Sequence, residues 1–161
     1  MCGIAGIFNS RLDLEQIHAA LCTMNHVQRH RGPDEAGILT VPEMAAGLAS
    51  CRLSIVDLER GQQPMPNENG RVHVVLNGEI YNHAALREVL AARGHRFRSR
   101  SDTEVVVHLY EEYGCECLKH LEGMFALAIL DRDRQTLLLA RDCVGMKHLY
   151  YSEVAGGLRC S

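Results

Sequence analysis

The sequence predicts an α+β fold in which antiparallel sheets are covered by helices. Short apolar strands with hairpin-length connections are interrupted by amphipathic helices, and the regular strand–helix–strand alternation of a parallel sheet is missing. Of the 161 residues, 47% are hydrophobic, which is enough for the core of one compact domain. We therefore expect residues 1–161 to form a single domain.

The N-terminal region is expected to contain one strand and one helix. Residues 3–8 alternate small and apolar side chains, which predicts a buried strand that starts almost at the first residue. Asp13 and Gln16 have the spacing of a capping box, and the apolar stripe behind them predicts a helix that ends before Arg29. This arrangement leaves Cys2 at a strand end.

Two strands and a second helix are expected in the middle of the chain. The strands cover residues 45–53 and 72–76, and Asn77–Gly78 closes the second of them. Apolar residues at helical spacing predict a helix over residues 83–93 that stops at Gly94. Because a helix follows Asn77–Gly78, the pair lacks the second strand that a hairpin needs.

A third helix and three strands are expected toward the C-terminus. Ser101 and Glu104 form a second capping-box pattern, which predicts a helix that continues through Tyr113. Apolar runs then predict strands at residues 125–131, 136–141 and 149–152.

Charge and composition argue against several classes of function. The net charge is -3, so the basic excess that binding to nucleic acid needs is missing. The longest apolar run, residues 124–130, is too short to cross a membrane. The seven cysteines are odd in number and irregularly spaced, which favours reduced thiols and gives no metal-site pattern. We expect a cytoplasmic protein that binds no nucleic acid, membrane or metal.

Cys2 is the first candidate for chemistry. Met1 in front of a small side chain is normally removed, which would leave a thiol and a free α-amine on the same residue. An α-amine has a pKa of about 7.7–8.0, so it can accept the thiol proton without a histidine. The position of Cys2 in the sequence, taken alone, is more typical of a buried structural cysteine than of a nucleophile. The other motifs of the chain decide between the two interpretations.

Three further features have candidate roles. A side-chain amide beside a glycine N–H, as in Asn77–Gly78, is the arrangement of an oxyanion hole. Arg52 ends a strand and is the residue type that binds a carboxylate through two parallel hydrogen bonds. Asp102 lies at a helix start, where an acidic residue more often interacts with the helix dipole than with a ligand.

Six motifs in one order resemble the glutaminase domain of glutamine-dependent asparagine synthetases, which are class II amidotransferases of the N-terminal-nucleophile kind. The motifs are residues 1–6, 29–34, 52–58, 76–83, 101–105 and 123–126. The resemblance extends to about residue 151. Class II amidotransferases that make glucosamine phosphate or act in purine synthesis share the leading cysteine and the Asn-Gly pair. They carry a Thr-rich segment where this chain has residues 53–56.

The resemblance implies a four-layer αββα sandwich and a reaction. Cys2 would be the nucleophile and its α-amine the base, while the Asn77 side chain and the Gly78 N–H would hold the oxyanion. L-Glutamine would be hydrolysed to glutamate and ammonia through a thioester. Residues 29–34 match a motif near the site, and we interpret them as a loop scaffold.

The resemblance also implies how glutamine is bound. Arg52 would pair with the substrate carboxylate, and Glu79 and Asp102 would face its ammonium group. Ile55 and Val56 match positions that line the glutamine pocket. No cofactor is expected in this domain, since ATP and Mg belong to the synthetase domain of the family.

The end of the chain departs from the family pattern. Cys143 and His148 stand where a basic residue and a proline are usual, and residues 158–161 fall within an expected strand. We expect a C-terminally incomplete domain without the synthetase domain, which could act in trans as a partner. Homo-oligomerisation stays open. So do two alternatives, a glutamine-binding or interaction module without turnover, and an ammonia donor to a different acceptor.

Overall fold

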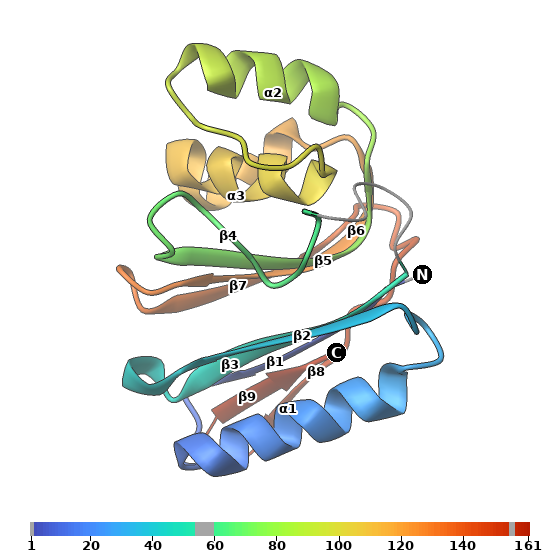
Figure 1. Cartoon of the computed structure of the whole chain (residues 1–161), viewed down its shortest axis with the longest axis vertical. Coiled ribbons are helices and arrows are strands. Elements are labelled where there is room, and N and C mark those ends of the chain that lie inside the picture. Colours follow the sequence, from blue (N-terminus) through green and yellow to red (C-terminus); the bar gives the residue numbers. More distant parts are fainter. Residues whose placement is uncertain (1, 54–59, 155–156) are drawn as a thin grey trace.

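Two antiparallel sheets face each other between two layers of helices in the computed structural model, which describes residues 2–53, 60–154 and 157–161 (Figure 1). Helices α2 and α3 cover the outer face of one sheet, and α1 covers the outer face of the other. This four-layer αββα arrangement confirms the predicted α+β class. Within the described ranges, no helix is both long and apolar enough to span a membrane.

The first sheet contains five strands in the order β2-β3-β1-β9-β8. In β1, Gly3 lies opposite Cys51 of β3, so Cys2 emerges beside the end of β3 where Arg52 lies. The β2 strand was not predicted, and β8 begins two residues later than expected. The strand bounds are Gly3–Phe8 for β1, Glu35–Val41 for β2, Ala46–Arg52 for β3, Tyr151–Val154 for β8 and Gly157–Cys160 for β9.

The second sheet contains four strands in the order β4-β5-β6-β7. The prediction that a strand closes at Asn77–Gly78 is wrong, because β5 continues to Ile80. Its antiparallel partner β6 pairs with it along the whole length, with Asn77 opposite Ala126. The bounds are Met65–Pro66 for β4, Val72–Ile80 for β5, Gly123–Asp131 for β6 and Thr136–Arg141 for β7.

Helices α1 and α2 begin and end where local signals predict. In α1 (Leu14–Gln28), the Gln16 N–H donates to Asp13 Oδ1 at 2.8 Å and the Asp13 N–H donates to Gln16 Oε1 at 3.1 Å. The predicted capping box is therefore confirmed. Helix α2 (His83–Ala92) stops before Gly94, whose φ of 103° interrupts helical geometry.

Helix α3 (Asp102–Tyr113) has only half of its predicted capping box. Ser101 Oγ accepts from the Thr103 N–H at 3.2 Å, as expected. The Glu104 carboxylate instead accepts from the N–H groups of Arg98 at 2.7 Å and Ser99 at 2.8 Å, so it fixes the preceding loop. All residues from 103 to 110 are buried, because α2 covers one side of α3 and the sheet covers the other (Figure 1). Among the described residues, the remaining elements are the 3-10 helices Pro42–Met44 and Gly114–His120.

Apolar side chains fill the three spaces between the layers. Val74 and Leu76 of β5 pack toward α3, whereas Val75 points between the two sheets. This alternation follows from the two-residue period of a strand. His73 therefore shares the inter-sheet face with Val75, and its buried Nδ1 has no hydrogen-bond partner. Desolvation, with the charge of Arg132 as a second cause, lowers the pKa of His73 to about 4.

We predict that His73→Leu flattens the dependence of stability on pH. Because the pKa of His73 is lower in the folded chain, the unfolded chain binds a proton more readily. The contribution of neutral His73 to the free energy of unfolding is therefore complete above about pH 6.5 and is lost as the pH falls toward about 4. In urea unfolding, the wild type should lose about 1–2 kcal/mol more than His73→Leu between about pH 7.5 and about pH 5. His18→Gln on the exposed face of α1 is the control and should behave as the wild type. Equal losses in all three proteins would contradict the assignment.

Candidate active site

A cavity of about 190 Å³ opens at one end of the space between the two sheets. Its wall includes six of the eight residues that the sequence predicts for the site: Cys2, Arg52, Asn77, Gly78, Glu79 and Asp102. The other two, Ile55 and Val56, lie outside the described residues. The first sheet supplies Arg52, with Cys2 just before β1, while β5 supplies the Asn-Gly-Glu segment and α3 supplies Asp102.

Cys2 is held at the start of β1 by the loop that precedes β2. Arg31 Nε donates to the carbonyl of Cys2 at 3.2 Å. Gly32 of the same loop lies so close to β3 that an added Cβ would be 2.4 Å from the carbonyl oxygen of Cys51. The sequence interpretation of residues 29–34 as a scaffold agrees with these contacts. The bond from Arg31 involves the backbone of Cys2, which also lines the cavity.

Cys51 lies next to Cys2 but has a different environment. Burial, with the neighbouring Cys2 as a second cause, raises the pKa of the Cys51 thiol. Its Sγ donates to the carbonyl of Asn25 at 3.0 Å, and its exposed fraction is 1%. Cys51 is therefore a structural thiol, whereas the half-buried Cys2 lines the cavity.

Arg52 is held by a carboxylate that the sequence did not indicate. Arg52 is 6% exposed, and its Nη1 lies 3.2 Å from Glu35 Oε2. Glu35 is directly opposite Arg52 in the β2–β3 pairing. Because β2 was not predicted, no local signal could have identified Glu35. The ion pair fixes the guanidinium at the cavity wall.

Asn77 and Gly78 lie inside a paired strand. The Asn77 side chain is buried, and Gly78 has a φ of 156°. A Cβ added at Gly78 would lie 2.0 Å from the carbonyl oxygen of Met124 on β6. The close pairing of β5 with β6 therefore requires glycine at this position. Glycine is needed here because the backbones of β5 and β6 lie so close together, and not because Asn77–Gly78 forms the hairpin turn that such a sequence suggests.

Asp102 joins the start of α3 to the end of β5. Its Oδ2 accepts from the Ile80 N–H at 2.9 Å. As the first residue of α3 it also interacts favourably with the helix dipole. Asp102 therefore has the structural role that is usual for an acidic residue at a helix start, and it also lines the cavity.

Gln63 is a cavity residue that the sequence did not indicate. Its Oε1 accepts from the Leu76 N–H at 2.7 Å, and its Nε2 donates to Thr103 Oγ1 at 3.2 Å. Its carbonyl accepts from Ser50 Oγ at 2.9 Å, so this residue connects both sheets with α3. The long sequence separations of these partners explain why no motif revealed it.

Lys147 also lines the cavity, on a turn that Asp142 holds against β6. The Asp142 carboxylate accepts from the N–H groups of Met146 at 2.9 Å, Lys147 at 3.1 Å and Phe125 at 3.2 Å. Desolvation opposes ionisation, but these backbone donors outweigh it and hold the pKa of Asp142 below its usual value. The unusual Cys143 lies within this turn, which closes on Asp142 nevertheless.

The cavity wall combines charges of both signs with a thiol and an amide. Arg52 and Lys147 are cationic, and Glu79 and Asp102 are anionic. A zwitterionic amino acid meets opposite charges in such a cavity, and a thiol beside amide donors suits acyl transfer. In the described part of the chain, the only group of His and carboxylate side chains able to hold a metal ion lies elsewhere, around His108.

Comparison with known proteins gives consistent matches. A family model described as "Glutamine amidotransferase domain" matches residues 1–160. The chain is 42% identical over 150 residues to asparagine synthetase [glutamine-hydrolyzing] 3 of Arabidopsis thaliana, a match that covers 93% of this chain and 25% of that protein. It is 41% identical over 150 residues to asparagine synthetase B [glutamine-hydrolyzing] of Escherichia coli, covering 93% and 26%. The chain thus spans about a quarter of the length of these relatives.

A solved structure shares the fold at lower sequence identity. Glutamine phosphoribosylpyrophosphate amidotransferase of B. subtilis superimposes with a TM-score of 0.75 at 21% identity, over 99% of this chain and 41% of that one. This similarity supports the αββα architecture.

We predict that Gly78→Ala destabilises the fold much more than Gly70→Ala. The added methyl would collide with the Met124 carbonyl, and strain adds to this overlap, so the expected loss is about 3 kcal/mol or more. Gly70 has a φ of 70° but nothing within 4 Å of its added Cβ, so its loss should be about 1–2 kcal/mol. Urea unfolding at neutral pH measures both. Equal losses would show that β5 and β6 are not closely paired at Gly78.

Proposed function

The chain belongs to the glutamine amidotransferase domain family, and from that premise we propose that it hydrolyses L-glutamine to glutamate and ammonia with Cys2 as the nucleophile. One observation carries the proposal. A single cavity is lined by Cys2, by an Asn-Gly pair and by side chains of opposite charge that suit the two ends of a free amino acid. These groups come from both sheets and a helix, so the fold is needed to assemble them.

The proposed reaction uses only groups of this chain and water. After removal of Met1, the α-amine of Cys2 accepts the thiol proton, and the thiolate attacks the side-chain amide carbon of glutamine. The Asn77 side chain and the Gly78 N–H stabilise the oxyanion. The C–N bond then breaks, and ammonia leaves with a proton returned by the α-amine. Water hydrolyses the thioester, which releases glutamate and restores the thiol.

The charged side chains of the cavity wall bind the two charged groups of the substrate. Arg52, held by Glu35, binds the α-carboxylate, because a guanidinium and a carboxylate form two parallel hydrogen bonds. Glu79 and Asp102 bind the α-ammonium group. Lys147 adds a second cation to the wall. The thiol must stay reduced, which fits a cytoplasmic setting.

The acceptor of the ammonia is inferred from the relatives. Residues 1–161 would be the glutamine amidotransferase part of an asparagine synthetase, since relatives with that name are 41–42% identical to the chain. A synthetase domain or subunit that uses ATP and Mg would receive the ammonia. The proposed glutamine hydrolysis itself needs no cofactor.

We predict that Cys2→Ala abolishes release of ammonia from glutamine, whereas Cys143→Ala retains it. Cys143 is exposed and absent from the described cavity wall, so it tests whether any thiol is sufficient. Intact mass before and after 6-diazo-5-oxo-norleucine should show loss of Met1 and one adduct in the wild type and in Cys143→Ala. An adduct on Cys2→Ala, or equal activity of both variants, would reject the assignment.

We predict that Asn77→Ala lowers kcat by about 10²–10³ with a smaller change in KM, because the amide acts on the transition state. Asn69→Ala, on the exposed turn before β5, is the matched control and should keep wild-type kinetics. Steady-state glutamate production measures both parameters. A change confined to KM would mean that Asn77 binds the ground state and does not hold an oxyanion.

A further inference from the structure

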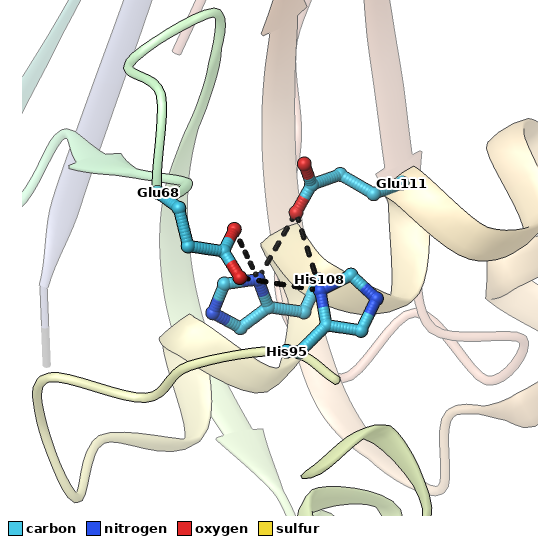
Figure 2. A group of neighbouring side chains, drawn as sticks. All are labelled: Glu68, His95, His108 and Glu111. Carbon is cyan, nitrogen blue, oxygen red and sulfur yellow. Dashed lines mark hydrogen bonds and ion pairs between the residues drawn. The ribbon is translucent and has the colours of Figure 1, made fainter. Parts of the chain in front are cut away.

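Four side chains converge on one point away from the cavity (Figure 2). Glu68 lies in the turn between β4 and β5, His95 lies in the loop between α2 and α3, and His108 and Glu111 lie one turn apart on α3. Each side chain offers one metal-binding atom, and these four atoms lie within 4.8 Å of one another. His108 is 1% exposed, while the two carboxylates are reached by solvent. An ion can therefore enter from the carboxylate side.

Several distances between imidazole nitrogens and carboxylate oxygens in this group are close to those between neighbouring ligand atoms of a tetrahedral metal site. His108 Nδ1 lies 3.0 Å from Glu111 Oε2 and 3.2 Å from Glu68 Oε2. His95 Nδ1 lies 3.4 Å from Glu68 Oε1 and 3.7 Å from Glu111 Oε2. In a tetrahedron with bonds of about 2.0–2.2 Å, neighbouring ligand atoms are about 3.3–3.6 Å apart. The four ligand atoms lie within 4.8 Å of one another, so the more distant pairs would move closer together when one ion is bound.

The outer nitrogens of both histidines face carboxylates. His95 Nε2 lies 3.1 Å from Glu112 Oε1, and His108 Nε2 lies 3.8 Å from Glu104 Oε1. His108 Nε2 is buried and has no hydrogen-bond partner in the described structure. When Nδ1 binds a metal, the ring proton resides on Nε2 and is usually donated to a carboxylate. His95 already makes this contact, whereas His108 Nε2 would have to move several tenths of an ångström closer to Glu104 to make it.

The two carboxylates are also held from outside the cluster. Asn67 Nδ2 donates to Glu111 Oε1 at 2.6 Å, and the Arg96 N–H donates to Glu68 Oε1 at 3.0 Å. Glu111 Oε2 faces both Nδ1 atoms, and each Glu68 oxygen faces one of them (Figure 2). Ligands that are fixed before the ion arrives lose little conformational freedom when they bind it.

We propose that Glu68, His95, His108 and Glu111 form a structural site for a divalent transition-metal ion, with zinc preferred. Two imidazoles and two carboxylates suit zinc, whereas calcium and magnesium prefer oxygen ligands alone. Four protein ligands leave no open position, which is typical of a structural site. The expectation of no metal came from the cysteine spacings, and it missed ligands that lie far apart in the sequence.

The ion would fasten two loops to α3. Residues 67–71 carry Glu68, and residues 94–101 carry His95 and lead into Asp102 at the cavity wall. Without an ion, protonation of His108 would have to balance the surrounding carboxylates. The competing interpretation is therefore an ion-pair network with a proton in place of the metal, and the two interpretations differ in whether zinc binds.

We predict one tight zinc site per chain, measured in the Cys2→Ala background so that neither that thiol nor turnover contributes. The protein is stripped with a chelator and titrated with zinc against a chromophoric competitor, and its melting temperature is recorded. Zinc should bind with one equivalent and raise the melting temperature. His95→Gln and Glu68→Gln should each weaken binding by more than about 100-fold, and Glu112→Gln by about 10–100-fold. His26→Gln, on exposed α1, should change nothing.

Two outcomes would overturn the site. Equal zinc binding by His95→Gln, Glu68→Gln and the Cys2→Ala parent would assign the ion to exposed thiols such as Cys115. Absence of stoichiometric binding by the folded parent would assign the cluster to a protonated ion-pair network. If His95→Gln fails to fold, the partly exposed Glu68→Gln decides alone. Because Cys2 is replaced throughout, failure of the proposed glutamine hydrolysis leaves this test unaffected.

Discussion

The candidate site depends on the packing of the two sheets against each other. Ile4 and Leu48 of the first sheet meet Val75 and Ala126 of the second in one apolar cluster. Side chains two residues apart on a strand share a face. Cys2 therefore continues the inter-sheet face of Ile4, and Asn77 continues that of Val75. The open end of the inter-sheet space becomes the cavity that both residues line.

Buried polar contacts keep this end of the sandwich in place. Glu35 holds Arg52, Gln63 joins both sheets to α3, and Asp102 accepts from the N–H of Ile80. Such contacts are strong in a low-dielectric interior and costly to leave unpaired. The cluster around His108 acts on the same helix from its other side, because it anchors the loop that leads into Asp102. Helix α3 thus links the cavity to the proposed metal site.

Much of the local structure follows from the sequence. Strand β1, helix α1 with its capping box and strand β7 have the bounds or the cap that short-range patterns predict. These signals act over a few residues, since a cap is made by side chains three positions apart. The β2 strand was missed, because its place is set by pairing with β3 and not by a strong apolar alternation of its own. Glu104 does not complete the capping box of α3, because its carboxylate accepts from the N–H groups of Arg98 and Ser99 in the loop before the helix.

The motifs and their order in the sequence predicted the α+β fold and six of the residues that line the cavity, which are Cys2, Arg52, Asn77, Gly78, Glu79 and Asp102. The folded arrangement was needed to show that these residues line one cavity, and that Glu35, Gln63 and Lys147 help to build it. It also decided that Asn77–Gly78 lies within a strand. Strand pairing and the convergence of side chains depend on contacts between groups far apart in the chain, and local sequence propensities do not describe such contacts.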